Sequence, residues 1–111
     1  MDLDVKVQTA TIAITGTVSG AIRIGGKTSI GIITPAALTG TAFTFQVSDA
    51  IAGTYVALLD TEGNTVSITV AASRGYGMSG SDADALSAFS YMKIVSNGAE
   101  AAARAILVIT K

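Results

Sequence analysis

The stretch TAFTFQVSDAIAGTYVALLDTEGNTVSITV, residues 41–70, decides the fold of this chain. Apolar and polar residues alternate over residues 43–48 and again over residues 66–70, and a period of two places successive side chains on opposite faces of a β-strand. Residues 55–59 (YVALL) are apolar in both parities, which is typical of a strand covered on both faces. Residues 60–64 (DTEGN) predict a tight turn, because glycine accepts a positive φ. The stretch therefore predicts three neighbouring strands with an apolar face that the rest of the chain must cover.

Further short strands are predicted on both sides of this stretch, at residues 21–24, 29–33, 75–78, 91–95 and 105–109. Short strands separated by turn residues are typical of an all-β fold, and we expect an antiparallel β-sandwich of jelly-roll type with about eight strands. Residues 82–89 follow an N-capping serine and contain good helix formers, so they predict at most one helical turn. The expected core consists of Phe43, Phe45, Val66, Ile68, Val70, Met92, Ile94, Leu107 and Ile109.

Residues 1–19 are expected to form an N-terminal strand or arm, followed by one sandwich domain over residues 20–111. The apolar residues of the arm change parity midway, which predicts a bulge near residues 10–11. An edge strand with free backbone groups tends to pair with another chain. We therefore expect the sandwich to fold without residues 2–15, and the arm, one strand and one loop to contact neighbouring subunits or a larger shell. The candidate contact residues are Val5, Val7, Ile12, Ile30, Ile32, Arg74, Tyr76 and Met78.

The composition favours a structural or binding role. Of the 111 residues, 50% are apolar and only 14% are charged, and the net charge is −1; a typical share of charged residues is about a quarter. A weakly charged surface suits a subunit of an assembly. The seven basic residues are scattered, so no nucleic-acid partner is expected. The N-terminus lacks the features of a signal peptide and no apolar run reaches the ~18 residues of a membrane span, so no membrane association is expected.

Catalytic and metal chemistry are not expected. The chain contains no histidine and no cysteine, which excludes the commonest general base and the thiolate ligands. Residues 60–64 resemble part of a calcium loop but lack its length and its distal glutamate, and the aspartates of residues 82–84 fit helix capping better than cation binding. Residues 25–28 (GGKT) lack the earlier glycine and the following helix of a phosphate-binding loop. Residues 74–78 (RGYGM) suggest a sugar-binding loop, although one tyrosine is a poor stacking platform. No cofactor is expected.

Residues 41–48 (TAFTFQVS), 60–64 (DTEGN) and 89–96 (FSYMKIVS) together resemble small β-sandwich structural proteins of tailed bacteriophages, including capsid decoration (cement) proteins. The resemblance covers roughly residues 20–111. It implies a non-catalytic virion protein, made in the host cytoplasm, that binds the major capsid protein on the capsid exterior and stabilises the head. It also implies a homo-oligomer, with a trimer favoured. The alternative functions are a phage tail or fibre component and a carbohydrate-binding β-sandwich module.

Overall fold

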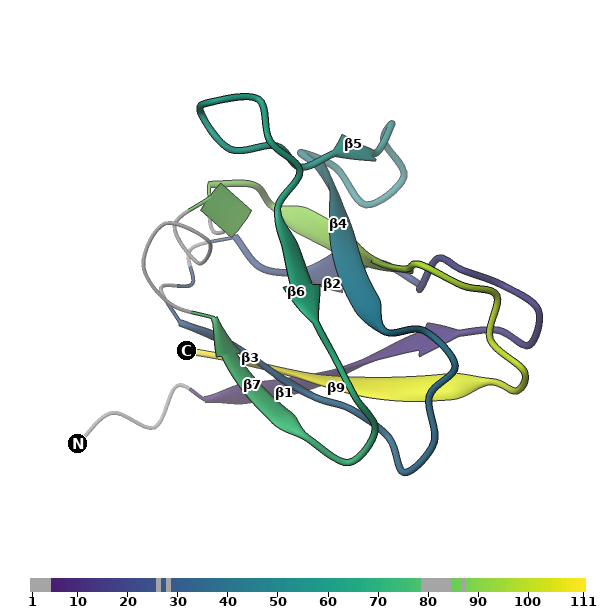
Figure 1. Ribbon diagram of the computed structural model, residues 1–111. Helices are drawn as coiled ribbons and strands as arrows, with labels where there is room; N and C mark the ends of the chain where they lie inside the picture. Colours follow the sequence, from purple (N-terminus) through teal and green to yellow (C-terminus); the bar gives the residue numbers. More distant parts are fainter. Residues whose placement is uncertain (1–4, 26, 28, 79–84, 87) are drawn as a thin grey trace.

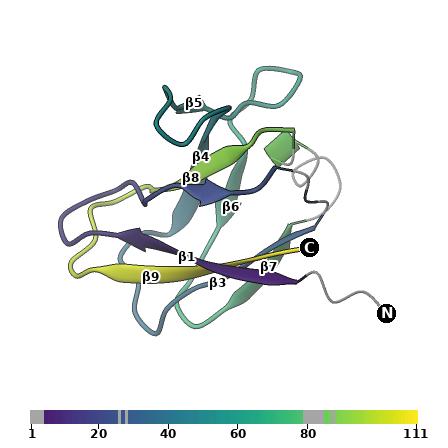
Figure 2. The ribbon, with the colours of Figure 1, turned by 180° about the vertical axis from the view of Figure 1, so that it is seen from behind.

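The protein consists of two packed antiparallel β-sheets (Figures 1 and 2). The computed structural model describes residues 5–25, 27, 29–78, 85–86 and 88–111. Within these residues the strands are β1 (Lys6–Ile12), β2 (Ile22–Arg23), β3 (Ile30–Ile33), β4 (Ala42–Ser48), β5 (Val56–Ala57), β6 (Ser67–Thr69), β7 (Gly75–Met78), β8 (Tyr91–Ser96) and β9 (Arg104–Thr110). No helix in the described part of the chain has the length and apolarity needed to cross a membrane.

The strand order is that of a jelly roll. One sheet has the order β1-β9-β3-β7, and the other has the order β2-β8-β4, with β5 and β6 both pairing with β4. The antiparallel pairs are therefore nested: β1 pairs with β9, β2 with β8, β3 with β7, and β4 with β5 and β6. Nested pairs of this kind arise when one long hairpin is wrapped into two sheets of a double Greek key. The predicted jelly-roll sandwich is confirmed.

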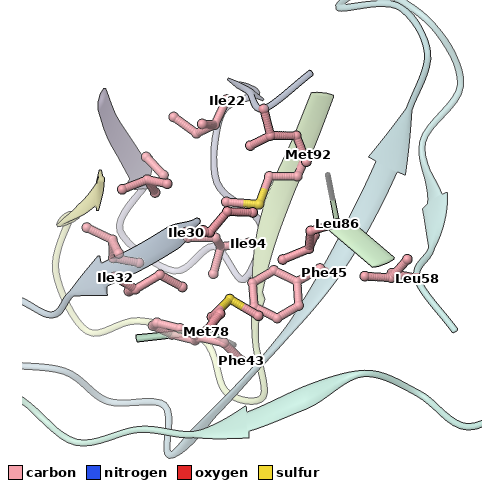
Figure 3. Packing of buried hydrophobic residues seen from close by; sticks show 14 of the residues in the cluster. Ile22, Ile30, Ile32, Phe43, Phe45, Leu58, Met78, Leu86, Met92 and Ile94 are labelled. Carbon is pink, nitrogen blue, oxygen red and sulfur yellow. The ribbon is translucent and has the colours of Figure 1, made fainter. Parts of the chain in front are cut away.

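The core lies between the two sheets and is built from alternate residues of most strands (Figure 3). Phe43 and Phe45 of β4 and Ile94 of β8 face Ile30 and Ile32 of the opposite sheet. Of the predicted core residues, those confirmed as buried are Phe43, Phe45, Val66, Val70, Met92 and Ile94. Ile68 is partly buried and packs against this cluster.

The prediction for the last strand had the wrong parity. Leu107 and Ile109 were expected in the core, but they are only partly buried, whereas Ile106 and Val108 are fully buried. Residues 105–109 are apolar in both parities, so their alternation does not identify the inner face. The register with β1 and β3 decides it, because shifting a strand by one residue exchanges its two faces.

The segment predicted as an arm contains β1, an edge strand of the sandwich. β1 pairs with β9 without interruption, from Lys6 opposite Thr110 to Ile12 opposite Arg104, so the predicted bulge is wrong. The change of parity has another cause: Val7 faces outward, with 57% of its surface exposed, while Ile12 points into the core with none exposed. β1 therefore carries apolar residues on both of its faces, and this explains the change of parity without a bulge.

The stretch 55–59 is also less buried than predicted. Only Val56 and Ala57 form a strand, both are exposed, and Leu58 alone is buried. β5 lies at the edge of its sheet beside β4, and the side chains of Val56 and Ala57 are exposed, so the stretch is not covered on both faces. This statement holds for the described residues.

The turn at residues 60–64 is confirmed. Gly63 has a φ of 83°, and the Asp60 carboxylate accepts hydrogen bonds from the amides of Glu62 and Asn64, both at 2.9 Å. Of the helical turn predicted over residues 82–89, Ala85 and Leu86 are helical, and Ala88 and Phe89 form a turn and a bend. Residues 82–84 and 87 of that prediction lie outside the described residues.

Candidate interaction surfaces

A buried carboxylate, Glu100, joins the loop before β4 to the connection between β8 and β9. Glu100 is 1% exposed and accepts hydrogen bonds from the amides of Thr39 (2.8 Å) and Gly40 (2.9 Å), the Ser96 hydroxyl (2.9 Å) and Arg104 Nε (2.9 Å). Burial by itself raises the pKa of this carboxyl, but these four hydrogen bonds outweigh burial and lower the pKa to about 2. A Glu100 that stays ionised and saturated with donors acts as a structural anchor.

Position 40, beside this anchor, has no room for a side chain and therefore requires glycine. A Cβ atom at Gly40 would collide with the Ser96 hydroxyl and approach a Glu100 carboxylate oxygen to 3.2 Å. The loop before β4 therefore meets the connection between β8 and β9 through backbone amides. This contact joins the two sheets at one end of the sandwich.

A groove of about 440 Å³ lies at the end of the sandwich that carries β5, and it is lined by Leu58, Leu59, Asp60, Thr61, Ala85, Ala88 and Phe89. The Asp60 carboxylate in this groove accepts the amide hydrogen bonds of its own turn. Within the described residues no group of three acidic side chains could hold a metal ion. The described residues that line the groove are mainly apolar, and among them no nucleophile is hydrogen-bonded to a base.

The outer surface of the β1-β9-β3-β7 sheet carries no charged side chain along its paired strands. We call it the apolar sheet face, and it consists of Val7, Thr9, Thr11, Gly31, Ile33, Gly75, Gly77, Ala105, Leu107 and Ile109. Val7 and Ile33 are 57% and 43% exposed. The outer face of an antiparallel sheet is normally polar, so a contiguous apolar one indicates an interaction site.

The register places these residues in rows across the four strands. Val7 lies beside Ile109, which lies beside Gly31, with Gly77 at the end of the row. The next row has Thr9, Leu107, Ile33 and Gly75 in the same order. Each row therefore runs from a β-branched residue on β1, over an apolar centre, to a glycine on β7. Lys111 follows β9 at the margin of the face.

Neither glycine of β7 is required by the packing of the described residues. A Cβ atom added to Gly75 or Gly77 would meet no atom within 4 Å, and neither residue has a positive φ. A larger residue would fit the chain and would favour the strand conformation. A glycine in a strand often marks a place where another backbone approaches closely. Without side chains at Gly75 and Gly77, the β7 side of the apolar sheet face leaves room for the backbone of another chain.

The structure separates the predicted contact residues into two groups. Val5 and Val7 are more than half exposed, Arg74 is exposed, and Tyr76 is partly buried, with its hydroxyl oxygen accepting a hydrogen bond from the Ala71 amide at 2.8 Å. The others lie in the core and are not accessible to a partner: Ile12, Ile30, Ile32 and Met78.

Sequence reasoning missed the most central residues of the apolar sheet face. Ile33, Leu107 and Ile109 share this face. Because both parities of β3 and β9 are apolar, alternation does not show which residues face outward. The sequence therefore predicts the buried Ile30 and Ile32 as contact residues and the outer residues of β9 as core residues. The signal that could have identified the face was the pair of glycines at alternate positions of residues 75–77, because β7 had been predicted as a short edge strand.

The outer surface of the other sheet has a different chemistry. We call it the cation–aromatic face, and it consists of Arg23, Gln46, Tyr55, Tyr91 and Lys93. The Arg23 guanidinium lies 5.7 Å from the centre of the Tyr91 ring and donates a hydrogen bond of 3.1 Å to its hydroxyl. The Lys93 ammonium lies 4.4 Å from the centre of the Tyr55 ring.

Comparisons with known proteins agree with this architecture. No family model and no curated protein sequence matches the chain. Among solved structures, the chain is similar to the crystal structure of the SPBc2 prophage-derived protein YomS, with a TM-score of 0.55 and 10% sequence identity. The alignment covers 99% of this chain and 96% of that one. At this identity the similarity shows a shared fold over the whole length of the described sandwich.

Proposed function

We propose that this chain is a non-catalytic structural protein of a tailed-bacteriophage virion. In this proposal it binds the outer surface of the major capsid protein shell through the apolar sheet face and stabilises the head. The observation that carries the proposal is an exposed sheet surface without a charged side chain among its ten residues, flattened on one side by Gly75 and Gly77.

The area of the apolar sheet face is small for a one-to-one complex, which favours binding of several copies to a repeating capsid shell. Four strands spaced by about 4.8 Å, over roughly 20 Å of strand length, give a face of roughly 400 Å². A stable one-to-one interface buries about 800 Å² on each partner. Several small faces that bind a repeating surface together gain affinity through their effective concentration. A homo-oligomer, with a trimer favoured, would bring several copies of this face to the shell.

The comparison with a solved structure supports a phage origin. The similar protein is described as prophage-derived, and its fold matches this chain over nearly all of both lengths. Folds host many functions, so the specific assignment to the head rests on the apolar sheet face and on the resemblance of the strand and turn segments to decoration proteins.

The test is sedimentation of the purified protein with phage heads that lack it. Changing Ile33 and Leu107 together to lysine puts two charges at the centre of the apolar sheet face, and we expect binding to fall by about 100-fold or more, because an unpaired charge in an interface costs several kcal/mol. Both side chains lie outside the core, so the melting temperature should stay within a few degrees of the original.

A second variant separates shape from charge. Gly77→Thr adds a side chain where the chain has open space, so it should keep or raise the melting temperature and still reduce binding to heads. Replacing Arg23 and Lys93 by glutamine on the opposite face is the matched control and should leave head binding unchanged. Heads bound equally well by the double lysine variant would overturn the proposal, and binding to tails in place of heads would favour the tail-component alternative.

A further inference from the structure

The cation–aromatic face holds two cations that form no salt bridge with any described residue of the chain. Within the part of the chain that the structure describes, the only salt bridge joins Arg104 to Glu100. Arg23 and Lys93 have no carboxylate within ion-pair distance there, and each lies over a tyrosine ring. A ring holds a cation in place by its quadrupole without neutralising it, so both charges stay available to an anionic ligand.

The two cation–ring pairs form one patch. Arg23 lies opposite Tyr91, and Lys93 lies two residues further along β8 on the same face, which corresponds to about 7 Å along the strand. Burial raises the pKa of the Tyr55 hydroxyl, and the neighbouring Tyr91 raises it further. The Tyr55 phenol therefore remains protonated and uncharged near neutral pH.

Neutral hydrogen-bonding groups complete the patch. Gln46 lies directly opposite Lys93 and carries both a donor and an acceptor. The Tyr55 hydroxyl donates to the Ile51 carbonyl at 3.0 Å and keeps its acceptor capacity. Amides, phenols and cations over flat aromatic rings are the groups that recognise the hydroxyl and carboxylate groups of sugars.

The backbone under this patch is already paired. β8 lies between β2 and β4, and β4 lies between β8 and β5 with β6. An extended peptide gains its affinity from a free strand edge or from pockets for its side chains, and the central strands of this sheet offer no free edge. A ligand that binds through its own hydroxyl and acid groups fits this surface better than a peptide does.

We propose that the cation–aromatic face binds an acidic polysaccharide, with its carboxylates paired to Arg23 and Lys93 and its hydroxyls bonded to Gln46 and the tyrosine hydroxyls. This inference goes beyond the proposed function and does not depend on it. The two faces belong to different sheets on opposite sides of the sandwich (Figure 2), so a chain docked through the apolar sheet face would present the cation–aromatic face to the surroundings.

The experiment measures binding of polygalacturonate to the full chain by calorimetry at low and high salt. We expect saturable binding that weakens as salt is added, because exposed ion pairs are screened. Changing Arg23 and Lys93 together to glutamine should weaken binding by about tenfold or more, since each lost charged hydrogen bond costs roughly 1.5–3 kcal/mol. The double variant should keep the melting temperature of the original protein within a few degrees.

A matched control removes the same net charge elsewhere. Lys6 begins β1 and Lys111 follows β9 in the other sheet, and both are exposed. Changing both to glutamine should leave polygalacturonate binding within about twofold. Equal losses in the two double variants would overturn the site in favour of a net-charge effect. Equal binding of polyglutamate and polygalacturonate would overturn the sugar assignment, and undetectable binding of polygalacturonate by the original protein would overturn the proposal. None of these outcomes affects binding to heads through the other face.

Discussion

The two outer faces of this sandwich are built alike and differ in chemistry. Each covers a sheet of short antiparallel strands whose inner residues complete the same core. One outer face has no charge among its central residues, and the other carries Arg23 and Lys93 over two tyrosine rings. Because folding requires only the inner faces to be apolar, the outer faces are free to reflect what the protein meets. The apolar sheet face is the departure from the usual pattern, and in our proposal it is the surface that a partner covers.

The strongest test of this comparison concerns β1, which contributes to both the core and the apolar sheet face. Deleting residues 2–15 removes Ala10 and Ile12, both fully buried, and uncovers the edge of β9. Losing one buried isoleucine costs about 2–5 kcal/mol, and the total stability of such a domain is about 5–15 kcal/mol. We now expect the shortened chain to unfold, against the expectation from sequence. Thermal denaturation followed by circular dichroism tests this. A cooperative transition near that of the full chain would show that β1 is a dispensable arm after all.

A sharper test compares two neighbouring residues of β9. Ile106 is fully buried, whereas Leu107 lies on the apolar sheet face. Ile106→Ala should lower the free energy of unfolding by about 2–5 kcal/mol, and Leu107→Ala by about 1 kcal/mol or less. Urea denaturation measures both values. The order should reverse for binding to heads, where Leu107→Ala should have the larger effect. Equal losses of stability would mean that the outer face contributes to folding as much as the inner one does.

A smaller effect concerns the anchor that joins the two sheets. Glu100→Gln should lower the free energy of unfolding by about 1.5–3 kcal/mol at pH 7, because hydrogen bonds to a charged group are lost. Glu62→Gln, at an exposed turn position, is the control and should change it little.

The same anchor predicts a pH dependence. The pKa of Glu100 is about 2 in the folded chain and has an ordinary value of 4.5. A carboxyl whose pKa is lowered by folding stabilises the protein above its unfolded pKa, and this contribution disappears as the pH falls through the folded pKa. The original protein should therefore lose about 3 kcal/mol between roughly pH 5 and pH 2 through this group. The difference from Glu100→Gln should shrink over that range. Urea denaturation at several pH values tests this, and a constant difference down to pH 2 would contradict it.

The sequence by itself determined the fold class and most of the core. Alternation over β4 and β8 predicted Phe43, Phe45, Met92 and Ile94 as core residues, because the polar residues between them identify the outer face. The turn at residues 60–64 was equally clear, since its aspartate and glycine have local backbone roles. These features depend on neighbours in sequence, so local patterns were sufficient to predict them.

Only the tertiary structure decided which residues form the two surfaces. In β3 and β9 both parities are apolar, and strand pairing alone places Ile33 and Leu107 outside and Ile32 and Ile106 inside. The cation–aromatic face joins residues from β2, β4, β8 and the segment before β5. Its members have no common local pattern, because register between strands distant in sequence brings them together. A sheet face is a property of pairing, and pairing is set by the whole core.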